Sequence, residues 1–304
     1  MSVFNGDGFL RNAIESILKQ TYQDFEFIII DDASTDATRS IISSYKDARI
    51  RIFANEENQG LVSCLNRGIE LARGEYIFRM DADDISEPTR IERQIAFMDG
   101  NRSIGIAGTW IRTLKADGGE VREFPADPEA ILCRLLFETV LAHPTVVFRK
   151  SVLMDNNLRY EQSFHRCEDY DLWVRAGRVT KISNISEPLL GYRIHSGQTG
   201  QKYSKIQGEL IRRIHARQLD ALGIRPSEQD LNLHRSIGKK VPQYRKSYLR
   251  EVDGWLARLE EANKKAGIYP EIQFKKTLDF YRKGAEESMV DFLGWFKIKL
   301  RQLI

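Results

Sequence analysis

The sequence predicts an α/β protein with an open, mostly parallel sheet and helices on both faces, followed by a helical C-terminal region. Two observations lead to this fold class. Strand and helix signals alternate over the first hundred residues, and strand signals stop beyond residue 200. Strands that alternate with helices of this length are joined by crossover connections, which make neighbouring strands parallel.

The strands of the first hundred residues are short apolar runs. Phe25–Asp31 (FEFIIID) is apolar and β-branched, which is typical of a strand buried on both faces. Ile50–Ala54 and Tyr76–Met80 are predicted to be two more strands. Apolar residues at three- to four-residue spacing predict the intervening helices: Phe9–Gln20, Thr35–Tyr45, Leu61–Ala72 and Glu87–Met98.

The first strand of this series falls at the very beginning of the chain. The order of elements is coherent only if Ser2-Val3-Phe4 belongs to a strand. A strand should begin several residues earlier, so we expect that the natural start of this strand is missing from the sequence.

The pattern continues less regularly after residue 100. Three further strands are predicted: Ile104–Trp110, His143–Phe148 and Leu189–Ile194. Two helices are predicted among them: Pro128–Glu138 and Glu168–Gly177. Beyond residue 200 the pattern predicts helices only: Ile206–Leu222, Glu228–Leu233, Tyr248–Lys264 and a last one from Phe274 onward.

The distribution of charge indicates a domain boundary near residue 200. Residues 1–199 contain 24 Lys and Arg against 30 Asp and Glu, whereas residues 200–304 contain 22 against 13. We therefore expect one domain over 1–200 and a basic helical region over 201–304. Such a region could face nucleic acid, an anionic membrane or an acidic ligand, or be a solvated helix surface.

The composition of the chain indicates the cellular compartment in which the protein works. No apolar run approaches the ~20 residues of a membrane-spanning helix. The three cysteines, Cys64, Cys133 and Cys167, are odd in number and far apart, which favours a reducing compartment over a disulfide framework or a structural zinc site. A cytoplasmic location is expected.

Clustered acids follow two of the predicted strands. Asp31-Asp32 comes after one strand, and Asp81-Ala82-Asp83-Asp84 comes after another. Sheets of this kind bind ligands outside the carboxyl ends of their strands. Carboxylates there suit Mg²⁺ or Mn²⁺ bound to substrate phosphates. The alternative for any one such motif is helix capping or a solvated loop.

Five separated motifs carry a resemblance to a known family. They read "SILKQTYQDFEFIIIDDASTDAT", "ENQGLVSCLNRGIELARGEYIFRMDADD", "HPTVVFRKSV", "CEDYDLWVRA" and "YRIHSGQT". In this order and spacing they closely resemble family 2 glycosyltransferases, inverting enzymes with the GT-A nucleotide-diphospho-sugar transferase fold. The resemblance covers about residues 1–200.

The resemblance implies roles for residues on the donor side. Asp83 matches the metal ligand, and Asp81 matches the carboxylate near the ribose of the sugar nucleotide. Asp32 matches the residue that bonds the nucleobase, and Asn66 an asparagine whose preceding residue is often arginine but is Leu65 here. The strand residues Ser2 and Phe4 match positions lining the base pocket.

On the acceptor side, Asp169 matches the catalytic base of the family, with Glu168 beside it to raise its pKa or orient the acceptor.

Two further residues match positions that act on the diphosphate. His195 matches a histidine that contacts the metal or the phosphate, and Arg193 matches a cation acting on the same diphosphate. Without the other motifs, Glu168 and Asp169 would be read as the acidic first turn of a helix, and His195 as a surface residue.

The function implied is inverting transfer of a sugar from a nucleotide-diphospho-sugar, commonly a UDP-sugar, to an acceptor hydroxyl, with Mn²⁺ or Mg²⁺. Lipid-linked or polysaccharide acceptors at the inner membrane face are typical of bacterial relatives, in polysaccharide or lipopolysaccharide synthesis. Two alternatives stay open: a phosphoryl-transfer hydrolase with the same Asp motif, and a non-catalytic nucleotide-sugar-binding module. An oxidoreductase is disfavoured because no GxGxxG follows the first strand.

Partners follow from the same resemblance. We expect a nucleotide-sugar donor, a saccharide or lipid-linked acceptor and no nucleic acid. Peripheral contact with an anionic membrane is suggested by "ESMVDFLGWFKIKLRQLI", where apolar residues recur at helical spacing near three basic side chains. The alternative is that this stripe packs on the protein itself or on a second subunit. A homodimer stays open.

Overall fold

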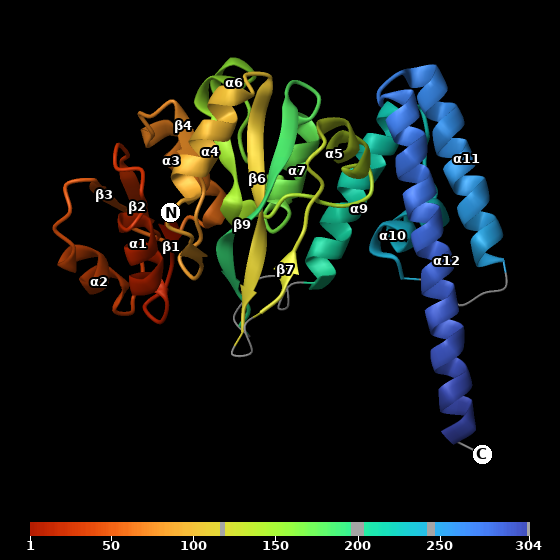
Figure 1. Cartoon of the computed structure of the whole chain (residues 1–304), viewed down its shortest axis with the longest axis horizontal. Coiled ribbons are helices and arrows are strands. Elements are labelled where there is room, and N and C mark those ends of the chain that lie inside the picture. Colours follow the sequence, from red (N-terminus) through yellow and green to blue (C-terminus); the bar gives the residue numbers. More distant parts are fainter. Residues whose placement is uncertain (116–118, 196–203, 242–246, 303–304) are drawn as a thin grey trace. The chain divides into compact units, whose positions relative to one another are not determined.

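The computed structural model describes residues 1–115, 119–195, 204–241 and 247–302, with the side chains of 291–302 outside the described part (Figure 1). It consists of two compact units. The α/β unit comprises Met1–Pro128 and Val140–Ser204, and the helical unit comprises Glu129–Thr139 and Lys205–Ile304. Residues 129–139 therefore belong with the helices of the C-terminal region, which their place in the sequence did not reveal.

A small parallel sheet opens the α/β unit. It has the order β1 (Ser2–Val3), β2 (Phe27–Asp31) and β3 (Ile50–Ala54), and all five residues of β2 pair with β3. The parallel arrangement predicted for these strands is confirmed. The connecting helices are α1 (Leu10–Leu18), α2 (Thr38–Ser44) and α3 (Leu61–Leu71). Helix α1 buries its apolar stripe, Leu10, Ala13, Ile14 and Ile17, in the core beside β2.

A second, mixed sheet follows. Its order is β4 (Tyr76–Phe78), β8 (Val147–Arg149), β6 (Ile104–Leu114), β9 (Lys181–Arg193) and β5 (Ile85–Ser86), with β7 (Val121–Arg122) on β6. Among the described strands of this sheet, β6 and β9 are the parallel pair, the two long strands seen side by side in Figure 1. β4 pairs antiparallel with β8, so the parallel series ends at β3.

Several predicted strands have different limits in the structure, and for two of them the structure shows the reason. His143–Thr145 forms a 3-10 turn, and the strand predicted from His143 begins only at Val147. Pro144 explains this, because it has no backbone N–H to donate to a sheet. The strand predicted over Leu189–Ile194 begins at Lys181, since the whole segment pairs with β6 through a register shift near Pro188.

The remaining helices of the α/β unit cover the second sheet and position its loops. They are α4 (Arg90–Gly100), α6 (Lys150–Asp155), α7 (Glu168–Ala176) and a 3-10 turn over Gln162–Phe164. Trp173 of α7 is fully buried and stacks near Phe148 of β8. This packing fixes the start of α7 relative to the sheet.

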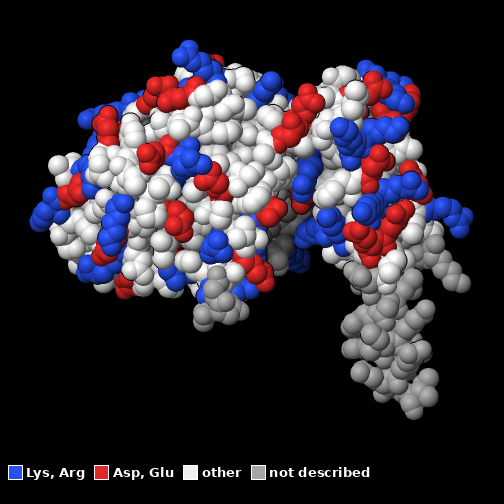
Figure 2. Space-filling view, viewed as in Figure 1, with Lys and Arg blue, Asp and Glu red and all other residues white. Residues whose placement is uncertain are grey.

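The helices of the helical unit are α5 (Pro128–Arg134), α9 (Ser204–Ala221), α10 (Glu228–Lys239), α11 (Tyr248–Ala266) and α12 (Glu271–Gln302). The first residue of α5, Pro128, still belongs to the α/β unit. Cys133 and Phe137 pack with Trp255, Leu259 and Tyr281 in one core, which is why 129–139 belongs to this unit. Basic and acidic side chains intermingle over its described surface in Figure 2. No described helix is long and apolar enough to span a membrane.

Candidate active site

The acidic residues after β4 form one cluster. Asp81, Asp83 and Asp84 each offer a carboxylate oxygen, and these oxygens lie within 4.8 Å of one another. The cluster is held at both ends, because β4 precedes it and β5 follows it at once, pairing Ile85 with Gly191 of β9. The chain therefore has little freedom to spread the three like charges apart.

The end of β9 closes on this cluster. His195 places Nε2 3.0 Å from Oδ2 of Asp83, and Nε of Arg193 donates to the main-chain carbonyl of Asp83 at 2.8 Å. The backbone N–H of Arg193 donates to Oδ1 of Asp84 at 2.9 Å. The structure thus brings together Asp83, Arg193 and His195, three of the residues singled out in the sequence.

Phe9 supports this arrangement, and the sequence carried no signal for it. The guanidinium carbon of Arg193 lies 4.5 Å from the centroid of the Phe9 ring, a cation–π contact. The ring of His195 lies 5.1 Å from the same ring. Phe9, which directly precedes α1, therefore orients the side chains of Arg193 and His195 beside the acidic cluster.

Asp84 has an unsatisfied carboxylate oxygen. The residue is buried, and its Oδ2 has no hydrogen-bond partner among the described residues. Burial raises the pKa of Asp84 to about 8, and the nearby charge of Asp81 adds to the shift. Such a group stays protonated at neutral pH unless a cation compensates its charge.

Arg79 is a buried cation next to the acidic cluster, and the sequence analysis did not predict it as a site residue. It is buried and forms an ion pair with Asp81 through Nη1. Its Nε is buried without a hydrogen-bond partner among the described residues. An arginine in an apolar strand just before three acids is the signal that could have revealed it.

Glu168 and Asp169 open α7, as predicted for a helix start. Burial raises the pKa of Glu168 to about 7, and the neighbouring charge of Asp169 adds to it. Burial also raises the pKa of Asp169, while the N–H of Tyr170 (2.7 Å to Oδ1) and the charge of Arg79 oppose the shift. A carboxylate with a raised pKa can accept a proton near neutral pH.

The two acidic groups act on each other electrostatically. The charge of Asp81 contributes to the raised pKa of Asp169, and Arg79 interacts with both carboxylates. Arg79 also acts on Glu168 and Asp84. Arg79 therefore acts electrostatically on carboxylates that are nearly ninety positions apart in the chain.

The family model for glycosyl transferase family 2 matches residues 1–155 of this chain. The chain belongs to glycosyl transferase family 2. The O-antigen biosynthesis glycosyltransferase WbnJ of Escherichia coli is 35% identical over 206 residues, which are 66% of this chain and 80% of WbnJ. The family resemblance expected from the five motifs is thereby confirmed.

Solved glycosyltransferases share the fold. S. aureus TarS 1–349, crystallised in complex with UDP-GlcNAc, matches with a TM-score of 0.62 at 17% identity over 95% of this chain and 90% of that chain. The mannosyltransferase PcManGT of Pyrobaculum calidifontis, in complex with GDP-Man and Mn²⁺, matches with a TM-score of 0.56 at 14% identity, covering 95% and 86%. The GT-A fold predicted for this glycosyltransferase is confirmed.

Asp32 of this glycosyltransferase is tied into the loop before α3. Its carboxylate accepts hydrogen bonds from Asn55 Nδ2 (2.7 Å) and from the backbone N–H groups of Gln59 and Gly60 (both 2.9 Å). Gly60 precedes α3 with a φ of 82°, a conformation that favours glycine. Asp32 therefore fixes the loop that leads into α3, and its predicted bond to the nucleobase stays a prediction.

Asn66 of the glycosyltransferase bridges to a distant loop. Its Nδ2 donates to the carbonyl of Tyr160 at 2.9 Å, and its Oδ1 accepts from the N–H of Tyr160 at 3.0 Å. These bonds tie α3 to the segment at Tyr160, and the predicted contact of Asn66 with the donor stays a prediction. Of the first-strand pair, Ser2 lines the cavity beside β2, while Phe4 is 51% exposed past the strand end.

The residues present fit a divalent cation. The cluster offers hard oxygen donors from Asp81, Asp83 and Asp84, and His195 adds a nitrogen donor. The free Oδ2 of Asp84 and the proximity of three carboxylates are unfavourable without positive charge. Oxygen-rich sites with few protein ligands suit Mg²⁺ or Mn²⁺.

Proposed function

We propose that this glycosyltransferase moves a sugar from a nucleotide-diphospho-sugar to an acceptor hydroxyl with inversion at the anomeric carbon. One observation supports the proposal: Asp83 bonds His195 and Arg193, while Asp81, two residues before it, acts electrostatically on Asp169. The residues around Asp83 suit a diphosphate and Asp169 suits an acceptor hydroxyl, so one donor and one acceptor would meet between them.

In this mechanism Asp169 takes the proton of the acceptor hydroxyl. The oxygen then forms a bond to the anomeric carbon from the face opposite the leaving group, while the bond between that carbon and the diphosphate oxygen breaks. The leaving nucleoside diphosphate keeps the electron pair of that bond. One displacement inverts the configuration, so no covalent intermediate is needed.

Other residues of this chain would bind the metal, stabilise the leaving diphosphate and orient the acceptor. Asp81 and Asp83, assisted by His195, would hold Mn²⁺ or Mg²⁺, which would supply positive charge to the departing diphosphate. Arg193, bonded to the main-chain carbonyl of Asp83, would add its own positive charge. Arg79 keeps Asp81 oriented through their ion pair, and Glu168 would orient the acceptor hydroxyl.

The donor and the pathway are further parts of the proposal. A UDP-sugar is favoured because TarS was solved with UDP-GlcNAc, although PcManGT was solved with GDP-Man. Cell-surface polysaccharide or lipopolysaccharide is favoured as the product because WbnJ is an O-antigen biosynthesis enzyme. The acceptor would be a saccharide or a lipid-linked glycan at the cytoplasmic membrane face, which agrees with the reducing compartment that the three cysteines favour.

A donor screen tests the proposal. Purified protein with Mn²⁺ is given a panel of UDP-, GDP- and dTDP-sugars together with lipid-linked and free saccharides. We expect nucleoside diphosphate release that depends on one donor, with a matching gain of one sugar mass in an acceptor. Release of inorganic phosphate without sugar transfer would instead support the hydrolase alternative, and binding without turnover of any donor would support the non-catalytic alternative.

A further inference from the structure

The 158–161 segment, which follows α6 and leads to the 3-10 turn before α7, is bonded to α3. Both main-chain groups of Tyr160 pair with the side-chain amide of Asn66 on α3. Nδ2 of Asn66 donates to the carbonyl of Tyr160 at 2.9 Å, and Oδ1 accepts from its N–H at 3.0 Å. A segment outside helices and sheets needs such partners for its backbone. Asn66 therefore fixes the 158–161 segment to α3 much as a neighbouring strand would.

The same segment is bonded to α7, the helix that carries the predicted catalytic base. Nη2 of Arg175 on α7 donates to the carbonyl of Arg159 at 2.6 Å. Arg175 also forms an ion pair at 2.7 Å with Asp171, which is fully buried one turn earlier on α7. Since Asp171 lies two residues after Asp169, this pair ties the 158–161 segment to the beginning of α7.

The side chain of Tyr160 provides a second route to α7. Tyr160 is 4% exposed, and its hydroxyl lies 2.8 Å from Nε2 of His143 in the 3-10 turn before β8. His143 is buried as well, and its ring packs edge-on against Trp173 of α7 with the centroids 5.8 Å apart. The phenol therefore connects to α7 through His143 and Trp173.

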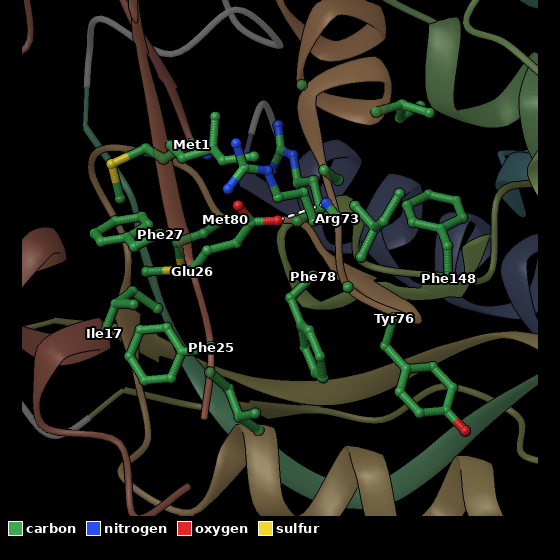
Figure 3. A pocket seen from close by; sticks show the side chains of 18 of the residues that line it. Met1, Ile17, Phe25, Glu26, Phe27, Arg73, Tyr76, Phe78, Met80 and Phe148 are labelled. Carbon is green, nitrogen blue, oxygen red and sulfur yellow. Dashed lines mark hydrogen bonds between the residues drawn. The ribbon is translucent and has the colours of Figure 1, made fainter. Parts of the chain in front are cut away.

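Tyr160 also lies close to charged groups of the candidate active site. Burial raises the pKa of its phenol against the opposing charge of Arg79, and the charges of Glu168 and Asp169 raise it further. Tyr160 and Arg79 both line the cavity of about 910 Å³ beside β2 that Figure 3 shows from close by. Tyr160 is thus near enough to interact electrostatically with the predicted catalytic base.

We propose that Asn66 and Tyr160 are positioning residues, which through the 158–161 segment set the place of Asp169 relative to α3. The inference rests on the proposed function, in which Asp169 takes the proton of the acceptor hydroxyl. The loop before α3 is fixed by Asp32, the predicted nucleobase residue, so α3 belongs to the donor side. A displacement of about 1 Å between reacting groups can lower a rate about 10²-fold, so a fixed link between the two sides matters for transfer.

Two variants test the link. Asn66→Ala removes the bonds to α3, and Tyr160→Phe removes only the hydroxyl, so the second variant serves even where the first does not fold. We expect sugar transfer per folded molecule to fall about 10–100-fold in each, with unchanged affinity for UDP in the presence of Mn²⁺. The double variant should lose little more than the more impaired single variant, because both residues act through one segment. Glu70→Ala, an exposed position on α3, is the control and should match the unaltered protein.

Hydrogen exchange gives a readout that needs no enzymatic activity. The N–H of Asp171 donates to the carbonyl of Cys167 at 3.1 Å, a bond of the first turn of α7. In both variants the amides of 170–172 should exchange about 2–10-fold faster, the factor that corresponds to the loss of one net hydrogen bond. The amides of α4 should be unaffected. If the unaltered protein transfers sugar from no donor, the proposed function fails, and the exchange rates still decide whether Asn66 and Tyr160 fix α7.

Three results would overturn the proposal. Weaker UDP binding by Asn66→Ala with normal exchange in α7 would show that Asn66 contacts the donor, as the family resemblance implies, and does not act through Tyr160. Faster exchange with unchanged transfer would show that the 158–161 segment only stabilises the fold. Unchanged transfer and unchanged exchange in both variants would exclude the segment from any role in placing Asp169.

Discussion

His195 Nε2 lies 3.0 Å from Oδ2 of Asp83, although the two residues are 112 positions apart in the sequence. The contact links the end of β9 to the acidic cluster after β4. It places a ring nitrogen of His195 beside the carboxylate that is expected to hold a divalent cation.

The first prediction concerns this contact. His195→Ala should weaken Mn²⁺ binding in the presence of UDP by about 10–100-fold, the range typical for loss of a partner that orients a metal ligand. Metal affinity is measured by calorimetry with and without UDP. His165→Ala, an exposed histidine, is the matched control and should bind as the unaltered protein does. Unchanged affinity in His195→Ala would remove His195 from the metal site.

The second prediction concerns the catalytic base. Asp169→Asn should lower turnover about 10²–10⁴-fold and leave UDP affinity unchanged, because the substitution keeps the size of the side chain and removes the proton acceptor. Steady-state kinetics and nucleotide titration check it. Asp155→Asn, an exposed position on α6, serves as control. Near-normal turnover in Asp169→Asn would contradict the assignment.

The third prediction concerns Arg79. Arg79→Met leaves Asp81 and Asp169 without their buried counter-charge, so the acid limb of the pH–rate profile should move to higher pH. Loss of the charged hydrogen bond should also destabilise the fold by roughly 1.5–3 kcal/mol. Arg79→Lys keeps the charge, so its pH–rate profile should lie close to that of the unaltered protein. Its stability should recover less than its pH profile, compared with Arg79→Met. A destabilised Arg79→Met with an unmoved profile would show that Arg79 is only structural.

The fourth prediction follows from the raised pKa of Glu168. With a pKa of about 7 in the folded protein against 4.5, the native state holds this proton more tightly than the unfolded chain does. The contribution of Glu168 to stability is therefore fully present below about pH 4.5 and is lost as pH rises to about 7. Glu168→Gln lacks the titration, so its melting temperature should gain on that of the unaltered protein by a few degrees over this window.

Melting curves from pH 4.5 to 8 in the presence of a chelator check the Glu168 prediction, with the exposed Glu56→Gln as control. The difference between Glu168→Gln and the unaltered protein should level off above pH 7. A difference that stays constant across the whole range would mean that Glu168 does not titrate as described.

The fifth prediction concerns the end of α12. Phe292, Phe296, Leu300 and Leu303 of the predicted apolar stripe have side chains outside the described residues, while the helix itself runs to Gln302. If this segment contacts membranes, the full chain should float with anionic liposomes and a chain ending at Glu286 should not.

A variant with Lys297, Lys299 and Arg301 changed to glutamate should lose flotation while keeping its melting temperature. Equal flotation of the full and shortened chains would exclude this helix as the anchor. A shortened chain that is also unstable would show that the stripe packs on the protein.

Local patterns in the sequence were enough for the elements and for the identity of the acidic motif. Buried strands such as Phe27–Asp31 and helices such as Leu61–Leu71 follow from periodicity, which depends only on near neighbours. The family and the GT-A fold followed from motifs that are contiguous in the chain. Asp81, Asp83 and Asp169 could be named for the same reason.

Tertiary structure alone decided which of these residues meet and how they titrate. Arg79 and Phe9 entered the site only through contacts with residues far along the chain, and Asp32 and Asn66 acquired hydrogen bonds that no local pattern indicates. The antiparallel pairing of β4 with β8 joins segments about seventy residues apart. The pKa of Glu168 depends on burial, a property that exists only once the chain is packed.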